Sequence, residues 1–285
     1  MRTLLTPPFL GHNARAFHSF GVPRRASTLS GFLGGVLKAT HRSGINSSSS
    51  QARIRISLGR IGGGGGDRGS GGPRFPGLNS IPSNYIFYGI MALNGAVFVG
   101  WQMATAEWKS LGDSSSYIRM RKNFTSSIYN LQQGRWYTLI TSSFSHENFG
   151  HIFFNGFTYF FFAPAALKML GNASFLALYL GGGVVCSLTS VLWNQILSPS
   201  HIQWSHGASG AIYSIISLSA CVSPRTTFLI YGIVPLPAWV FLAGIFAWDG
   251  YSAITHRQSS TDSAGHIGGL LTGVVYFLAK RRRFF

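Results

Sequence analysis

The sequence predicts an all-α membrane protein built as a bundle of six transmembrane helices. Charged residues make up only 10% of its 285 residues and apolar residues 46%, whereas a soluble domain carries about 25% charged residues. The apolar residues gather in runs separated by polar breaks, and most runs approach the ~20 residues that cross a bilayer as a helix. These runs cover residues 84–104, 149–169, 173–193, 208–222, 227–247 and 264–280.

The fourth run is the shortest. At 1.5 Å per residue, its roughly 15 residues span about 22 Å, less than the ~30 Å of the hydrocarbon core. We therefore expect helix four to begin below the membrane surface and the preceding loop, residues 203–206, to dip in to meet it. Irregular backbone at membrane depth is tolerated where it lines a water-filled cavity, so the start of helix four is expected to be wet.

The N-terminal part of the chain differs from the rest. The formal net charge is +17, and no Asp or Glu precedes Asp67. An Arg- and Ser-rich segment without acids is typical of an organellar transit peptide, so we assign this role to residues 1–60, with the organellar import machinery as partner. Nucleic-acid binding is the competing explanation, but no nucleic-acid-binding motif accompanies the basic arm. The Gly- and Pro-rich residues 61–82 are expected to form a linker, and residues 83–285 the membrane domain.

Basic residues in the short loops predict the orientation. With six spans, both ends of the membrane domain lie on one side of the bilayer. That side receives Arg68, Arg74, Lys168, Arg225 and the basic residues 280–283. Since basic residues in short loops mark the side from which insertion began, we expect a multi-pass protein of the mitochondrial inner membrane with both termini in the matrix. A chloroplast membrane is the alternative.

Three spans carry polar residues at similar depth. Helices two, four and six run in the same direction, and near their starts lie His151 with Asn155, Ser209, and His266, respectively. Polar groups inside spanning segments are costly and indicate function. A serine hydroxyl becomes a nucleophile when a base takes its proton, so Ser209 and His266 predict a Ser–His dyad. His151 and Asn155 share one helix face and, with the Ser209 N–H, are expected to stabilise an oxyanion.

Glycines flank both members of this pair. Gly207 and Gly210 surround the serine, and Gly265, Gly269 and Gly273 form a ladder with four-residue spacing. Small residues of this kind let membrane helices approach closely. We expect these glycines to be helix-packing residues that bring helix six against helix four. A packing patch without any chemistry is the alternative explanation.

Three blocks resemble the rhomboid intramembrane serine proteases. They are Gly207-Ala208-Ser209-Gly210, the segment 265–273, and an HxxxN-type block at 151–155. The resemblance covers residues 84–285. It implies a serine endopeptidase that cleaves peptide bonds in or near transmembrane segments of membrane-protein substrates, without a metal or other cofactor.

The chain departs from this family's pattern in one place. Many rhomboids carry a Trp-Arg pair in the long first loop, and the corresponding positions here are Tyr137 and Thr138, with a reversed and displaced pair at Arg135-Trp136.

No third triad member is evident. We interpret Asp262 and Asp249 as loop or interface carboxylates. Two cysteines lie in apolar runs and are expected to be buried rather than disulfide-bonded; they are Cys186 and Cys221.

Other functions stay open. A non-catalytic rhomboid-like protein that binds membrane clients is the main alternative, although such proteins typically lack the serine or the histidine. His146-Glu147 begins a zinc-protease-like pattern, but the second histidine, His151, follows five residues later instead of four. That spacing sets the two imidazoles roughly 140° apart around a helix, which does not suit a shared metal. A transporter is disfavoured because the spans lack carboxylates for ion coupling.

Overall fold

The computed structural model describes residues 76–197, 202–230, 233–255 and 262–284. The predicted transit peptide and most of the predicted linker lie outside these residues. Each of the six predicted apolar runs overlaps a helix: α2 (Ser83–Leu111), α6 (Phe149–Leu170), α7 (Asn172–Leu197), α8 (Ser209–Val222), α9 (Ala238–Thr255) and α10 (Ser263–Lys280). By length and hydropathy, two helices of the described part, α2 and α7, meet the requirement for crossing a membrane.

The long segment between α2 and α6 is folded into short helices. Its elements are α3 (Ser115–Phe124), α4 (Ile128–Gln132), α5 (Thr138–Thr141) and the 3-10 turn η1 (Ser142–Phe144). A short helix α1 (Pro76–Asn79) precedes α2, and a 3-10 turn η2 (Arg281–Arg283) follows α10. Side-chain caps explain where two long helices begin: Asn148 Oδ1 accepts from the N–H of His151 at α6, and Asp262 Oδ1 accepts from the N–H of Gly265 at α10.

The prediction for residues 227–247 is wrong in its first half. The chain there forms an antiparallel hairpin of β1 (Thr227–Ile230) and β2 (Val234–Pro237), and α9 begins only afterwards. The physical reason lies in the two prolines of β2. Proline disfavours helical backbone in the residue before it and lacks the N–H that a helix interior needs. The described fold is therefore mostly helical with one small sheet, instead of purely helical.

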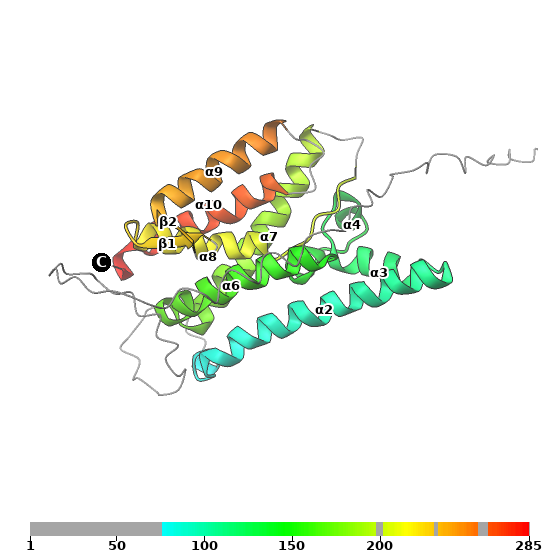
Figure 1. Cartoon of the computed structure of the whole chain (residues 1–285), viewed down its shortest axis with the longest axis horizontal. Coiled ribbons are helices and arrows are strands. Elements are labelled where there is room, and N and C mark those ends of the chain that lie inside the picture. Colours follow the sequence, from blue (N-terminus) through cyan, green and yellow to red (C-terminus); the bar gives the residue numbers. More distant parts are fainter. Residues whose placement is uncertain (1–75, 198–201, 231–232, 256–261, 285) are drawn as a thin grey trace, which may run out of the picture. The chain divides into compact units, whose positions relative to one another are not determined.

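Helices α7, α8 and α10 pack against one another, and α9 lies against α10 (Figure 1). The backbones of α8 and α10 are in contact, since a Cβ added at Gly269 would lie 2.3 Å from the carbonyl oxygen of Gly210. One turn further, a Cβ at Gly273 would lie 2.0 Å from Ser217 Oγ. Only glycine permits this approach, and it brings the first turn of α8 beside the first turn of α10.

Helix α2 runs alongside α6 and is attached to the rest of the bundle near both ends (Figure 1). Toward its start, the rings of Phe87 and Tyr159 stack with centroids 5.3 Å apart. Toward its end, Trp101 Nε1 donates to Ser145 Oγ at 2.7 Å, and both side chains are almost fully buried. The stretch of α2 between these two attachments borders a cavity that is described below.

Candidate active site

Ser209 and His266 meet at the contact between α8 and α10. Ser209 is the first residue of α8, and His266 lies in the first turn of α10. The Nε2 atom of the imidazole is 2.8 Å from the serine Oγ, which is hydrogen-bonding distance. The imidazole is 8% exposed, so its contact with the hydroxyl is largely shielded from the surroundings.

Asp249 lies on the other side of the imidazole. Its carboxylate oxygens are 3.3 and 3.4 Å from His266 Nδ1, and the residue is 3% exposed. Our interpretation of this residue as a loop or interface carboxylate is therefore wrong. A sequence signal was present, because Asp249 is the one charged residue of α9, and a carboxylate within an apolar run indicates function.

Asp262, the other candidate carboxylate, does not contact the imidazole in any described hydrogen bond or ion pair. One of its oxygens caps α10, and the other accepts a hydrogen bond from the hydroxyl of Ser205. The loop that leads to Ser209 has further attachments. Ser205 exchanges two backbone hydrogen bonds with Ser126, at 2.8 and 2.9 Å, and the N–H of Gly207 donates to Ser142 O at 2.9 Å. The segment between α2 and α6 therefore holds the loop that carries the serine.

His151 lies beside the same loop. Gly207 has φ +136°, a conformation that favours glycine. A Cβ at this position would lie 2.7 Å from the Cε1 and Nε2 atoms of His151 and 3.8 Å from Ser209 Oγ. Gly207 thus permits the imidazole of α6 to approach the serine.

Asn155, the other predicted oxyanion donor, is oriented differently. Its side-chain Nδ2 donates to the carbonyl oxygen of His151 at 3.0 Å. The amide is therefore engaged with its own helix. Of the four predicted polar residues, the structure brings Ser209, His266 and His151 together, while Asn155 lies one turn further along α6.

Three of the predicted packing glycines, Gly210, Gly269 and Gly273, lie at the α8–α10 contact. Gly210 also packs on α7, since a Cβ there would meet Cys186 at 2.2 Å. Gly265 has a different neighbour from the one expected, because a Cβ there would meet the capping carboxylate of Asp262 at 2.6 Å. Both cysteines of the chain, Cys186 and Cys221, are free.

Three histidines cluster around the serine loop. The ring centroids of His146 and His151 are 4.8 Å apart, and those of His151 and His206 are 6.0 Å apart. Burial lowers the pKa of His146 to about 3, and its Nε2 accepts a hydrogen bond from the N–H of Ala208 at 3.3 Å. His146 precedes α6, so the angle around a helix that we calculated for His146 and His151 does not apply to these two residues. Within the described residues, no group of three His, Cys, Asp or Glu side chains is arranged to hold a metal ion.

Residues 133–283 match the rhomboid domain. The chain belongs to the rhomboid family. Its relatives include Rhomboid protein 1, mitochondrial, of Saccharomyces cerevisiae, which is 29% identical over 206 residues, or 72% of this chain and 55% of that protein. RHOMBOID-like protein 12, mitochondrial, of Arabidopsis thaliana is 27% identical over 72% of this chain and 61% of the relative. Rhomboid-like protein 16, chloroplastic, of the same plant is 27% identical over 70% of this chain and 63% of the relative. The matches thus span between 55% and 63% of these rhomboid proteins.

The first loop of this rhomboid is folded although the Trp-Arg pair is missing. Thr138, at the second position of the pair, is fully buried and donates from its hydroxyl to the carbonyl oxygen of Arg135 at 2.6 Å. The Arg135 Nε donates in turn to Oδ1 of the buried Asn130 at 2.9 Å. A local hydrogen-bond network therefore orders the loop in this rhomboid chain.

Proposed function

We propose that this rhomboid is an intramembrane serine endopeptidase that cleaves membrane-protein substrates in or near their transmembrane segments. The observation that carries the proposal is the 2.8 Å contact between Ser209 Oγ and His266 Nε2 at a backbone contact of two helices. A serine hydroxyl needs such a base to become nucleophilic. The family supports the same reaction class.

In the proposed reaction, His266 Nε2 takes the proton of Ser209 as Oγ attacks the carbonyl carbon of the scissile peptide bond. The imidazolium then gives this proton to the leaving amine, and the C–N bond breaks to leave an acyl-enzyme. Water hydrolyses the ester with His266 again as the base. Asp249 is proposed as a positioning residue, because a carboxylate at Nδ1 orients the ring and stabilises the imidazolium.

The oxyanion of the tetrahedral intermediate requires donors near Ser209. The serine N–H is at the first position of α8, where a helix offers no internal acceptor for it. His151 has its Nε2 beside the serine loop. Asn155 contributes only after its amide turns away from the His151 carbonyl. We propose all three as donors, with Asn155 recruited when substrate binds.

The membrane arrangement is also a proposal. The six long helices are proposed to span the membrane, with short α8 carrying the nucleophile and both termini in the mitochondrial matrix. The names of the yeast and plant relatives support a mitochondrial membrane, and the chloroplast relative keeps that organelle as the alternative. Residues 1–60 are proposed as the targeting segment recognised by the import machinery. Deleting them is expected to leave the protein outside its organelle, and import of the truncated protein would contradict the assignment.

A fluorophosphonate probe and a reporter with a transmembrane segment test the chemistry together. The full chain in proteoliposomes is expected to react with the probe and to cleave the reporter. Ser209→Ala and His266→Ala are expected to lose both activities. Ser219→Ala is the matched control, because its hydroxyl lies on the same helix and bonds only the Ile215 carbonyl in the described structure. Probe labelling that survives Ser209→Ala would refute the nucleophile. Reporter binding without labelling or cleavage by the unmodified chain would instead establish the client-binding alternative.

A further inference from the structure

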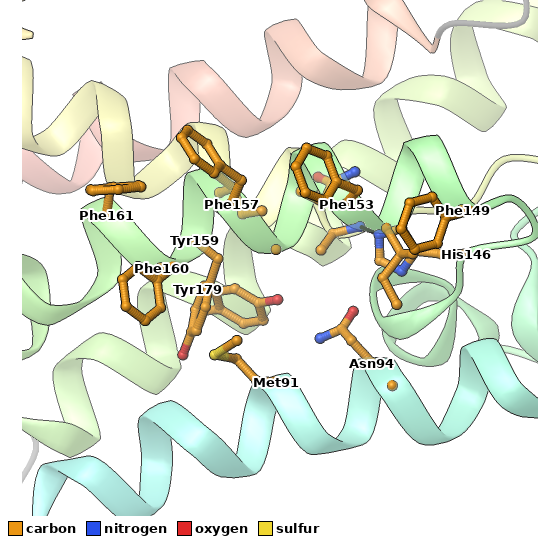
Figure 2. A pocket seen from close by; sticks show the side chains of 16 residues that line it. Met91, Asn94, His146, Phe149, Phe153, Phe157, Tyr159, Phe160, Phe161 and Tyr179 are labelled. Atoms are coloured by element: carbon orange, nitrogen blue, oxygen red, sulfur yellow. Dashed lines mark hydrogen bonds between the residues drawn. The ribbon is translucent and has the colours of Figure 1, made fainter. Parts of the chain in front are cut away.

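A cavity of about 530 Å³ lies between α2 and α6 (Figure 2), and its lining includes Asn155 and Ala208, the residue before Ser209, but neither Ser209 nor His266. Its volume falls in the range of about 300 to 1,000 Å³ that is usual for small-molecule sites. The attachments at Phe87 and at Trp101 hold α2 against the bundle on both sides of the cavity. Between them the helices do not fill the space: a Cβ added at Gly95 of α2 or at Gly156 of α6, which both line the cavity, would meet no atom within 4 Å.

The walls are mainly apolar, with Phe or Tyr at seven of the sixteen lining residues, and carry no Lys, Arg, Asp or Glu. Three phenylalanines of α6 that line the cavity, Phe153, Phe157 and Phe161, are also between 40% and 55% exposed. They form a rim that faces the surroundings of the bundle, which for a membrane protein are lipid chains. The cavity is thus open to a molecule that arrives from the bilayer.

One end of the cavity is polar and incompletely paired. Three buried polar atoms of the lining have no hydrogen-bond partner among the described residues: Asn94 Oδ1, His146 Nδ1 and the Tyr179 hydroxyl oxygen. Figure 2 shows the Asn94 amide projecting from α2 into the cavity and His146 lying across from it. Because His146 Nε2 accepts from the N–H of Ala208, the proton of the neutral ring is on Nδ1. The lining therefore offers the Nδ1–H donor of His146, the Oδ1 acceptor of Asn94 and the Tyr179 hydroxyl, which can donate or accept.

The occupant must match these features. A hydroxyl both accepts and donates, so hydroxyl groups of a ligand suit all three unpaired atoms. A carboxylate or phosphate finds no cation among the lining residues, and a buried unpaired charge is strongly disfavoured. Water alone does not suit the walls, since each buried water needs 2 to 4 polar partners. We propose that this cavity binds a single-chain lipid with an uncharged, hydroxyl-bearing head group, of which a monoacylglycerol is the simplest example.

The test uses the full chain in nanodiscs and a monoacylglycerol whose acyl chain carries a diazirine and an alkyne. Light-dependent labelling is expected on the peptides that contain residues 91–95 and 149–161. An excess of unlabelled monoacylglycerol is expected to suppress the labelling, and the same excess of a fatty-acid methyl ester to suppress it less. Labelling spread evenly over all helices, or suppressed equally by both competitors, overturns the proposal.

Cavity-filling variants separate this site from general lipid contact. Gly95→Leu and Gly156→Leu place side chains in the cavity and are expected to lower labelling at least about tenfold. Gly89→Leu is the matched control, since Gly89 lies on α2, outside the cavity lining, and its Cβ would also meet nothing within 4 Å. Asn94→Leu is expected to reduce the preference for monoacylglycerol over the ester about fivefold, as for the loss of one hydrogen bond. Unchanged labelling in both cavity-filling variants refutes the site.

The outcome is independent of the proposed protease chemistry. Reaction of Ser209 with the fluorophosphonate probe is measured on the same samples. Lipid labelling without serine reactivity removes the proposed function and leaves the lipid site standing. Serine reactivity without selective lipid labelling removes only the lipid site.

Discussion

Replacing Asp249 by asparagine tests whether this carboxylate positions the imidazole of His266 in the proposed Ser–His dyad. The asparagine keeps the size of the side chain but removes its charge, and its amide can hold the imidazole in the wrong tautomer. In triads with a short carboxylate–imidazole contact, this change lowers kcat about 10⁴-fold. Here the separation is 3.3 Å, longer than the ~2.7–2.9 Å of a strong charge-assisted hydrogen bond. We therefore expect a smaller loss in kcat of about 10- to 100-fold, or about 1.4 to 2.7 kcal/mol.

The assay is cleavage of a transmembrane reporter in proteoliposomes over a range of reporter concentrations, with thermal unfolding measured in parallel. For Asp249→Asn, kcat is expected to fall while KM and the unfolding temperature stay close to those of the unmodified chain. Asp262→Asn is the matched control. It makes the same chemical change four residues before His266, and asparagine caps a helix as well as aspartate does, so kcat is expected to stay within about threefold. Equal kcat values for the two variants, or an unchanged kcat in Asp249→Asn, would refute the positioning role.

Three further outcomes follow from the geometry. Gly269→Leu inserts a side chain at a position where even a Cβ would lie 2.3 Å from the Gly210 carbonyl oxygen of α8, so we expect destabilisation by about 1 to 3 kcal/mol or more in thermal unfolding. Gly244→Leu on α9 is the control and should unfold like the unmodified chain, because a Cβ there would meet nothing within 4 Å. Similar unfolding temperatures for the two variants would contradict the α8–α10 contact. Asn155→Ala should lower kcat by up to about 10²-fold if the amide donates to the oxyanion, and an unchanged kcat removes it from the site. Trp101→Phe deletes the buried bond to Ser145 and should lower stability by about 1 kcal/mol, which denaturant unfolding can measure.

Helix boundaries were predictable where local sequence decides them. The run 149–169 became α6 at Phe149–Leu170, which the Asn148 side chain caps, and the run 208–222 became α8 at Ser209–Val222, which begins without a side-chain cap. In both cases the position of the helix follows the local apolar run. The proximity of Ser209 and His266 was also accessible, since small-residue spacing indicates close helix packing.

What could not be predicted depends on distant contacts. The hairpin before α9 needs cross-strand pairing that no helical period reveals. The apolar sequence around Asp249 marks this carboxylate as a candidate, but its partner, His266, depends on how α9 packs on α10. Likewise, Asn155 shares a helix face with His151, but its hydrogen bond to the His151 carbonyl depends on a side-chain rotamer.

The backbone contact of Gly210 with Gly269 joins the first turn of α8, which carries Ser209, to α10, which carries His266. We therefore expect thermal motion to carry the serine and the imidazole together, because close-packed elements move as a unit. In the proposed reaction, an extended peptide enters by displacing other elements. We expect amide hydrogen exchange to be slow in α8 and α10 and faster in the stretch of α2 that borders the cavity, around Asn94 and Gly95. Access and the proposed chemistry would then belong to separate parts of the same chain.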